Sequence, residues 1–213
     1  MNAGLLPVKA LGAAKRRLGP HFDPGQRALI ARALFEDALS LCDATRWLDW
    51  WIVSSDRFAR SAAAERGLRV IQDPGTGLNA ALQSGLRAIG EAGATSVTIV
   101  PADVPLATPE DLLDVRDTGT TSDVVVVPAR RDGGTNGLYL RPPGLLEPRF
   151  GPGSLQAHAA LADRLALRCS ILPLPHLALD IDTIDDVDEL LASPRATGGR
   201  AGALLSRLRS LPA

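Results

Sequence analysis

Short apolar runs alternate with helical segments along most of this chain, and that alternation limits the possible folds more than any other feature. The runs at residues 3–8, 50–54 and 96–100 have the length and composition of buried strands. Segments with apolar residues spaced three and four apart follow each of them. Because strands separated by helices form parallel sheets covered on both faces, we predict an α/β fold, a three-layer sandwich with a mainly parallel, mixed sheet.

The individual elements can be assigned from periodicity and end signals. We expect seven strands, at residues 3–8, 50–54, 68–72, 96–100, 123–128, 136–140 and 170–174. We expect helices at residues 24–43, 57–66, 78–92, from 109, 154–167 and 184–192, with N-cap residues Asp23, Thr108, Ser154 and Thr183. The turn Gly133-Gly134 predicts one antiparallel hairpin. Residues 1–194 are predicted to form one domain, and 195–213 a C-terminal tail with a short helix, either loosely docked or an oligomer contact.

Composition excludes several classes of protein. The 213 residues are 46% hydrophobic, which suits one substantial core. The 23 Lys and Arg nearly balance the 24 Asp and Glu, so a general nucleic-acid binder is not expected. The two cysteines lie far apart, which disfavours a zinc site or a disulfide framework. No signal peptide and no apolar run of about 18 residues is present, so we expect a cytoplasmic protein without a membrane partner.

Three aspartates follow predicted strands, where ligands of open α/β sheets bind. Asp103 comes after the strand 96–100 in P-A-D-V-P, and Asp180 and Asp182 lie in L-D-I-D-T. Because Mg²⁺ prefers carboxylate oxygens, we predict a magnesium site here. Asp103 also suits a turn between prolines. Of Asp180 and Asp182, one is expected to bind metal while the other orients a ligand or caps the last helix. The acidic residues at 185–189 are expected to be solvated.

A basic loop directly follows the first predicted strand. It contains Lys9, Lys15 and Arg17 but neither G-x-G-x-x-G nor G-K-[ST]. Its cations suit the phosphates of a nucleoside triphosphate, and a solvated basic turn is the alternative. The segment F-G-P-G-S at 150–154 places two glycines and a hydroxyl before a helix, where backbone amides bind a phosphate or carboxylate. The segment G-G-T-N at 133–136 either does the same or forms only a hairpin turn.

The three histidines, His21, His158 and His176, share no ligand spacing, and no nucleophile motif is present. A reaction whose nucleophile is an already ionised phosphate or carboxylate needs no general base. Alignment of the reactants and charge neutralisation by Mg²⁺ and Lys or Arg are then sufficient. The residues described above match that requirement.

With these residues assembled, the chain resembles the CofC/FbiD family of guanylyltransferases, which act in making coenzyme F420. The resemblance extends from about Leu5 to Leu191 and rests on six motifs in the same order. They are L-P-V-K-A-L-G-A-A-K-R-R-L at the start, D-P-G-T-G-L-N-A-A-L from Asp73, P-A-D-V-P-L from Pro101, G-G-T-N-G-L from Gly133, F-G-P-G-S from Phe150 and L-D-I-D-T from Leu179.

The resemblance implies a nucleotidyltransferase (GT-A-like) fold that binds GTP and Mg²⁺ above the sheet. It implies transfer of GMP to a small phosphorylated carboxylic acid, namely 2-phospho-L-lactate, phosphoenolpyruvate or 3-phospho-D-glycerate, with release of diphosphate. Carried over by motif, the catalytic residues are Lys15, Arg17 and Asp103; the nucleotide-binding residues are Pro7, Val8, Lys9, Asp73, Leu78 and Asn79; the acceptor-binding residues are Thr135, Gly151 and Ser154; and the magnesium ligands are Asp103, Asp180 and Asp182.

Departures from the family pattern are few. Arg16 lies where relatives often have Ser or Thr, and Ala102 and Val104 replace the more usual Gly and Leu. Two alternatives remain: a nucleotidyltransferase for another phosphorylated acceptor, such as molybdopterin or a sugar phosphate, and a non-catalytic nucleotide-binding domain. The acceptor acid, the basis of guanine preference, a homodimer and a transient hand-over of product to a downstream transferase are left open by the sequence.

Overall fold

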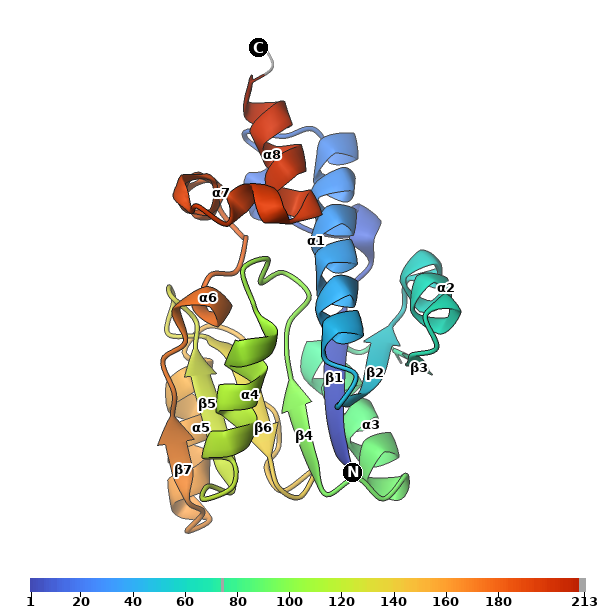
Figure 1. Cartoon of the computed structure of the whole chain (residues 1–213). Helices are drawn as coiled ribbons and strands as arrows, with labels where there is room; N and C mark the ends of the chain where they lie inside the picture. The colour runs from blue at the N-terminus through green and yellow to red at the C-terminus, as the bar shows by residue number, and fades with distance from the viewer. Residues whose placement is uncertain (74, 211–213) are drawn as a thin grey trace.

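A single mixed sheet forms the centre of the computed structural model, which describes residues 1–73 and 75–210 (Figure 1). Its strands are β1 (Asn2–Val8), β2 (Asp49–Ser54), β3 (Arg69–Gln72), β4 (Ser96–Ile99), β5 (Val124–Pro128), β6 (Thr135–Leu140) and β7 (Cys169–Ile171). The strand order is β3-β2-β1-β4-β6-β5-β7. Strand β6 is antiparallel to its neighbours β4 and β5, and the other pairs are parallel. The predicted mainly parallel, mixed sheet and its hairpin are confirmed.

Eight α-helices connect and cover these strands within the residues that the structure describes. They are α1 (Pro24–Ala44), α2 (Arg57–Glu65), α3 (Leu78–Glu91), α4 (Pro109–Thr118), α5 (Ser154–Arg164), α6 (Pro175–Ala178), α7 (Ile184–Ala192) and α8 (Arg200–Ser210). Short 3-10 helices lie at Leu11–Ala13, Arg16–Leu18 and Ala196–Gly198. None of the helices within 1–73 and 75–210 is both long enough and apolar enough to span a bilayer.

The sheet is buried between two layers of helices because side chains of successive strand residues point to opposite faces. On one face Leu6 of β1 packs with residues of α1, α2 and α4. On the other face Leu5 packs with residues of α3 and α5. Figure 1 shows α1 and α4 in front of the sheet and α3 and α5 behind it. This arrangement is the predicted three-layer sandwich.

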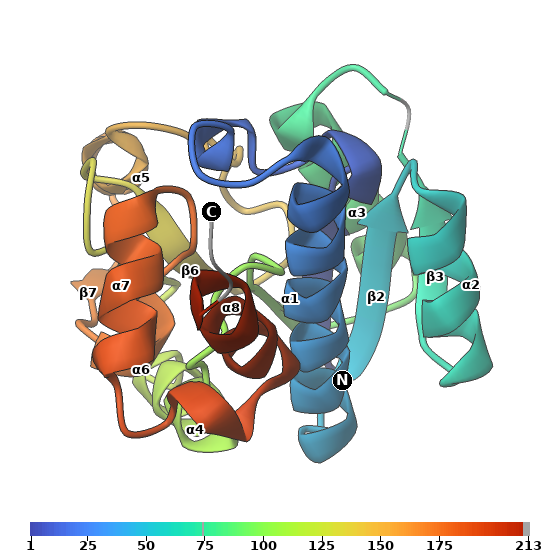
Figure 2. The same cartoon turned by 90° about the horizontal axis from the view of Figure 1, so that it is seen from above.

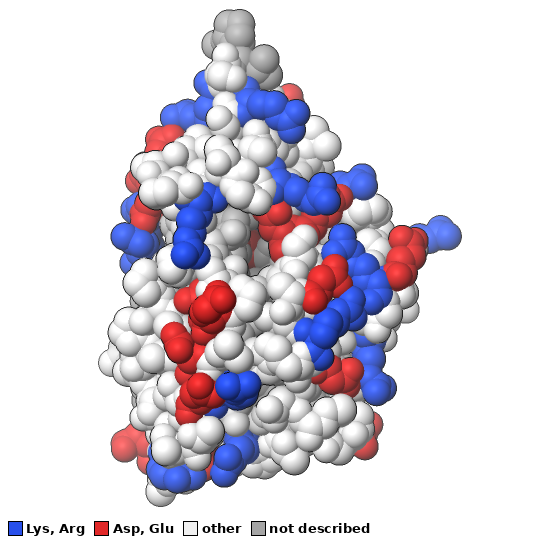
Figure 3. Space-filling model, in the orientation of Figure 1, with Lys and Arg blue, Asp and Glu red and all other residues white. Residues whose placement is uncertain are grey.

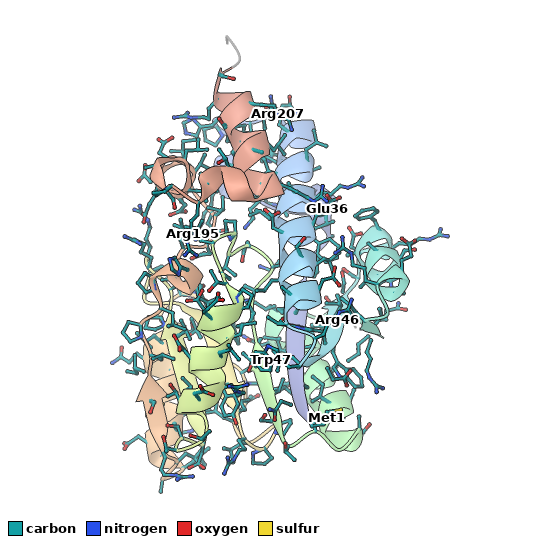
Figure 4. The ribbon with its side chains drawn as sticks, viewed as in Figure 1. Met1, Glu36, Arg46, Trp47, Arg195 and Arg207 are labelled. Carbon is teal, nitrogen blue, oxygen red and sulfur yellow. The ribbon has the colours of Figure 1, made fainter. Side chains whose placement is uncertain are left out.

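A third apolar cluster lies above the carboxyl edge of the sheet, where α8 packs between the first half of α1 and α7 (Figure 2). The Asp37 carboxylate of α1 accepts hydrogen bonds from the backbone N–H groups of Arg200 and Ala201, which fixes the first turn of α8. Figure 4 shows Arg207 of α8 at this end of the molecule and Met1 at the opposite end. The loops that follow the parallel strands therefore open beneath α7 and α8.

Helix starts follow the capping residues of the sequence in three of four cases. Asp23 and Thr108 form capping boxes at α1 and α4, and Thr183 is the N-cap of α7. The prediction for Ser154 was wrong, because Gly153 is the N-cap of α5 and adopts a left-handed conformation with φ 70°. The strand predicted at 170–174 ends at Ile171, and Pro175 begins the short helix α6 instead.

Candidate active site

The ammonium group of Lys15 lies between two of the predicted carboxylates. Its Nζ is 2.6 Å from Asp103 Oδ2 and 3.2 Å from Asp182 Oδ1, and its side chain is only 7% exposed. These contacts form because β1 and β4 are adjacent parallel strands, so the loops that follow them meet at the carboxyl edge. The backbone N–H of Ile181 donates to the Asp103 carbonyl (3.0 Å), which brings the segment of Asp182 to the same place.

Two physical effects oppose each other at Lys15. Burial lowers its pKa, but the attraction of Asp103 and Asp182 is larger in sum, so the pKa is raised and the group stays charged. Lys15 also has a left-handed backbone with φ 57°, a conformation that is costly for a residue with a Cβ atom. Arg17 is more exposed and lies 3.7 Å from Asp182. The structure therefore brings Lys15, Arg17 and Asp103 together with Asp182.

Asp180, in contrast, faces the hairpin β5–β6. Its Oδ1 accepts a hydrogen bond from Asn136 Nδ2 (3.0 Å), which also donates to the Ala178 carbonyl. Burial raises the Asp180 pKa to about 6, and the neighbouring charges of Asp103 and Asp182 add to the increase, against the hydrogen bond from Asn136. The negative charges of Asp103 and Asp182 thus disfavour ionisation of Asp180, and a cation placed beside Asp180 would oppose that effect.

These donors fit a divalent cation in chemistry, since hard oxygen ligands suit Mg²⁺. Within residues 1–73 and 75–210, however, no three His, Cys, Asp or Glu side chains are grouped closely enough to hold a metal ion. The ammonium of Lys15 occupies the place between Asp103 and Asp182 instead. Whether Asp103, Asp180 and Asp182 bind magnesium stays a prediction.

Two small cavities lie along the loop that follows β1 and carries Lys9 and Lys15, here called the lysine loop. Most of the predicted nucleotide-binding residues line these cavities. One, of about 170 Å³, lies against Lys15, Asp103, Asp182 and Phe150. The other, of about 240 Å³, lies against Ser55 and Asp73. Both are lined by the same four residues, Pro7, Val8, Lys9 and Leu78, and they therefore form two parts of one groove. The groove extends from the carboxylates to the start of α3.

Asn79 has a different position from the other predicted nucleotide-binding residues. Its Oδ1 accepts the N–H of Phe150 (2.8 Å), and its Nδ2 donates to the Phe150 carbonyl (3.2 Å). Phe150 in turn lines the cavity next to Lys15. The amide of Asn79 thus holds the segment before Gly151 beside the groove, and contact of Asn79 with a nucleotide stays a prediction.

The predicted acceptor-binding residues lie at the start of β6, at the start of α5 and in the turn before α5, and the loops that precede these two elements are joined by backbone hydrogen bonds. The N–H of Gly153 donates to the Asp132 carbonyl (3.1 Å), and that of Leu155 donates to the Gly133 carbonyl (3.0 Å). This joining brings the buried hydroxyls of Thr135 and Ser154 within 3.1 Å of each other. Gly151 adopts φ 135°, and a Cβ atom on it would meet open space. The structure therefore brings Thr135, Gly151 and Ser154 together, and their role stays a prediction.

The sequence prediction treated the acidic residues at 185–189 as solvated, and for Asp186 that was wrong. Asp186 is 4% exposed. Its Oδ2 accepts hydrogen bonds from the N–H groups of Asp182 and Thr183, and its Oδ1 pairs with Arg131 Nε at 2.8 Å. The last loop before α7 is therefore tied to the hairpin loop by Asp186. Neither Asp180 nor Asp182 caps the helix.

Charges on the face shown in Figure 3 are interspersed, in agreement with the net charge of −1. Outside the groove, most basic side chains pair with nearby carboxylates, as Arg168 does with Asp123 and Arg209 with Asp188. Lys15 differs from these surface pairs because it is buried against residues 88 and 167 positions away in sequence.

Comparison with known proteins agrees with this geometry. Residues 2–209 match the family described as "Guanylyl transferase CofC like". The chain belongs to this family. A phosphoenolpyruvate guanylyltransferase from Conexibacter woesei is 36% identical over 211 residues, which cover 96% of this chain and 95% of the relative. A 3-phospho-D-glycerate guanylyltransferase from Phenylobacterium zucineum is 34% identical over 217 residues, 99% of this chain and 98% of the relative.

A solved structure supports the assignment of the fold. The crystal structure of a putative nucleotide-diphospho-sugar transferase from Desulfovibrio desulfuricans superposes on this chain with a TM-score of 0.83 at 19% sequence identity. The matched residues cover 98% of this chain and 95% of the other. The fold is therefore of the nucleotidyltransferase type, as the resemblance implied, and the chain is an enzyme of the CofC-like family. The two curated relatives bear the names of different acceptors at nearly equal identity, so overall identity does not select between them.

Proposed function

We propose that this member of the CofC-like family transfers GMP from GTP to a small phosphorylated carboxylic acid and releases diphosphate, as a step of coenzyme F420 biosynthesis. The relatives named for phosphoenolpyruvate and 3-phospho-D-glycerate support the class of acceptor. The observation that carries the proposal is the position of Lys15, buried between Asp103 and Asp182 in a groove next to the loops of Thr135 and Ser154.

The arrangement suits in-line attack by an acceptor phosphate on the α-phosphorus of GTP. The acceptor is an anion at neutral pH and attacks without losing a proton, so no general base is needed. The new bond forms between the acceptor phosphate oxygen and the α-phosphorus, while the bond to the bridging oxygen breaks and diphosphate leaves with the electron pair. The preorganised cations of Lys15 and Arg17 stabilise the charge on the departing diphosphate.

Asp103 and Asp182, with Asp180 beside them, are the residues that would hold a divalent cation. When bound, such an ion would supply charge neutralisation and alignment of the phosphates. The oxygen donors suit this role, and the ion would have to displace the ammonium of Lys15 from its place between Asp103 and Asp182. Groove residues such as Pro7, Lys9 and Leu78 would hold the nucleotide.

The test is diphosphate release from GTP with Mg²⁺ and each of 2-phospho-L-lactate, phosphoenolpyruvate and 3-phospho-D-glycerate, with ATP, CTP and UTP as controls. We expect turnover with GTP and one acid. If no acid led to diphosphate release although GTP bound in a magnesium-dependent way, the result would favour a different phosphorylated acceptor. Binding of GTP without magnesium and without turnover would favour a non-catalytic nucleotide-binding domain.

A variant tests the assignment of the carboxylate. Asp103→Asn keeps the shape of the side chain but removes the charge that faces Lys15, and we expect turnover to fall by about a hundredfold or more. Asp114→Asn, on the exposed face of α4, is the control and should keep wild-type turnover. Near-normal activity in the Asp103 variant would contradict the role assigned to this carboxylate.

A further inference from the structure

The buried His158 of α5 contacts Thr135 at the start of β6 and the segment just before Gly151, and both places carry predicted acceptor-binding residues. It is fully buried, and its Nδ1 lies 3.1 Å from Thr135 Oγ1. Its Nε2 accepts the backbone N–H of Arg149 at 2.9 Å. Its ring also meets the Phe150 ring edge-on, with centroids 5.3 Å apart. One imidazole therefore joins strand β6, helix α5 and the segment before Gly151.

The hydrogen bonds of His158 determine where its proton is. Nε2 accepts an N–H, so it has a free lone pair and no proton. Burial, with a smaller contribution from the charge of Arg149, lowers the pKa to about 4, so the ring is neutral at pH 7. A neutral imidazole without a proton on Nε2 has it on Nδ1. His158 therefore donates to Thr135 and does not accept from it.

This direction determines the orientation of the Thr135 hydroxyl. Its oxygen accepts one hydrogen bond from His158 Nδ1 and a second from Ser154 Oγ, at 3.1 Å each. A hydroxyl has two acceptor lone pairs and one proton, so both acceptor positions are filled. Neither of these hydrogen bonds uses the Thr135 proton, and the described residues provide no other side-chain hydrogen bond for it. The proton remains available to a negatively charged oxygen.

The same ring also helps to hold in place the segment at Arg149 and Phe150, which borders the groove. Two consecutive N–H groups are held from different helices, that of Arg149 by His158 of α5 and that of Phe150 by Asn79 of α3. The adjoining turn has space outside it, because a Cβ atom on Gly151 or Gly153 would meet no other atom within 4 Å. An anion bound at this turn would lie next to the cavity that Phe150 shares with Lys15 and Asp103.

We propose that His158 is a positioning residue for the acceptor: its neutral Nδ1–H tautomer makes the Thr135 hydroxyl a hydrogen-bond donor to an anionic oxygen of the phosphorylated acid, and its Nε2 holds the turn at Gly151. This inference rests on the proposed function. It assigns no proton transfer to His158, which stays neutral throughout the reaction.

The first test compares steady-state kinetics of His158→Phe and His158→Gln with the wild type. The phenylalanine ring keeps the apolar packing but has no nitrogen, so we expect the KM for the acceptor to rise about tenfold to a hundredfold while the KM for GTP changes less than about twofold. Glutamine has one donor and one acceptor and should recover part of this loss. His176→Gln, on a partly exposed histidine of α6, is the matched control.

A double-mutant cycle with Thr135→Val distinguishes positioning from a general loss of structure. If His158 acts through the Thr135 hydroxyl, removal of that hydroxyl should raise the acceptor KM much less in the His158→Phe background than in the wild type. Equal effects in both backgrounds would overturn the proposal. Equal increases in both KM values for the histidine variants would also overturn it, since they would indicate a structural role only.

The tautomer can be measured independently of catalysis. Nitrogen-15 chemical shifts of the His158 ring at pH 7 should show the proton on Nδ1 and none on Nε2, and the opposite assignment would overturn the proposal. If the wild type released no diphosphate with any acid, the proposed function would fail by itself. The ring shifts and the dissociation constants of phosphoenolpyruvate and 3-phospho-D-glycerate for wild type and His158→Phe would then still decide the role of His158.

Discussion

The ammonium of Lys15 occupies the place between two carboxylates, and this makes a specific prediction about the Lys15→Met variant. Methionine keeps the length and apolar stem of the side chain, which is only 7% exposed, but removes the charge 2.6 Å from Asp103 and 3.2 Å from Asp182. A divalent cation that binds to these carboxylates without nucleotide must compete with the ammonium. The variant should therefore bind such a cation more tightly and yet turn over more slowly.

The size of the effect follows from the exposure of the partners. A pair of unit charges about 4 Å apart is worth roughly 4 kcal/mol at an effective dielectric constant of 20. Asp103 and Asp182 are 31% and 42% exposed, so solvent reduces that attraction. We assign about 1–2 kcal/mol to the competition between the ammonium and the metal ion, a value between those of surface and buried ion pairs. This free energy corresponds to about fivefold to thirtyfold in metal affinity. If Lys15 stabilises the leaving diphosphate as we propose, loss of its charge should lower kcat by about 10²–10³.

The assay is a titration of the nucleotide-free protein with Mn²⁺, followed by calorimetry or by the electron paramagnetic resonance signal of the free ion. Arg16→Met, which removes an exposed cation from the same loop, is the matched control and should change neither metal affinity nor turnover. Weaker metal binding in Lys15→Met, or unchanged affinity with reduced turnover, would refute the reasoning that the ammonium and the metal compete for the same carboxylates.

Three further predictions concern stability. Burial lowers the pKa of His158 from 6.5 to about 4, so the unfolded chain binds this proton at a higher pH than the folded protein does. The free energy of unfolding therefore has its full value above pH 6.5 and decreases as the pH falls towards 4, by as much as about 3 kcal/mol. Urea unfolding at pH 7 and pH 5 should show this decrease in the wild type and a smaller one in His158→Gln. Asp186→Asn weakens the buried contact with Arg131 and should lower the free energy of unfolding by about 1–3 kcal/mol, seen as a Tm lower by several degrees; an unchanged Tm would contradict the structural role of this carboxylate. Asp37→Ala removes the acceptor for the first N–H groups of α8 and should cost about 1–2 kcal/mol in thermal unfolding while turnover stays normal, and a loss of turnover would show that α8 contributes to the site.

Much of the fold was predictable because its signals are local. The capping box of Asp23 and Gln26 and the apolar periodicity of the following helix lie within the segment that they define. The hairpin at Gly133 was likewise predictable from its turn residues and its β-branched strand. Ser154 was one exception, since the left-handed backbone of Gly153 ends the turn and starts α5 without a side-chain cap.

The candidate site was predictable in its residue types but not in its contacts. The motifs indicated Lys15, Asp103 and Asp182, yet the salt bridges among them span 88 and 167 positions in sequence and have no local signal. Asp186 was expected in solvent because its neighbours are acidic, but it accepts the N–H groups of Asp182 and Thr183 and is covered by Arg131 from the hairpin loop. His158 has partners 9 and 23 residues away, so its spacing to other histidines gave no indication of its role.

The central claim is that this enzyme joins GMP to a phosphorylated acid, and phosphorus-31 NMR of the reaction products tests it most directly. With GTP, Mg²⁺ and the preferred acid, the account predicts equal amounts of free diphosphate and of a new phosphoanhydride that contains the guanylyl group and the acceptor phosphate. Release of GDP and phosphate, or of GMP with diphosphate and unchanged acid, would contradict it, because either result would mean that water and not the acceptor attacks the nucleotide.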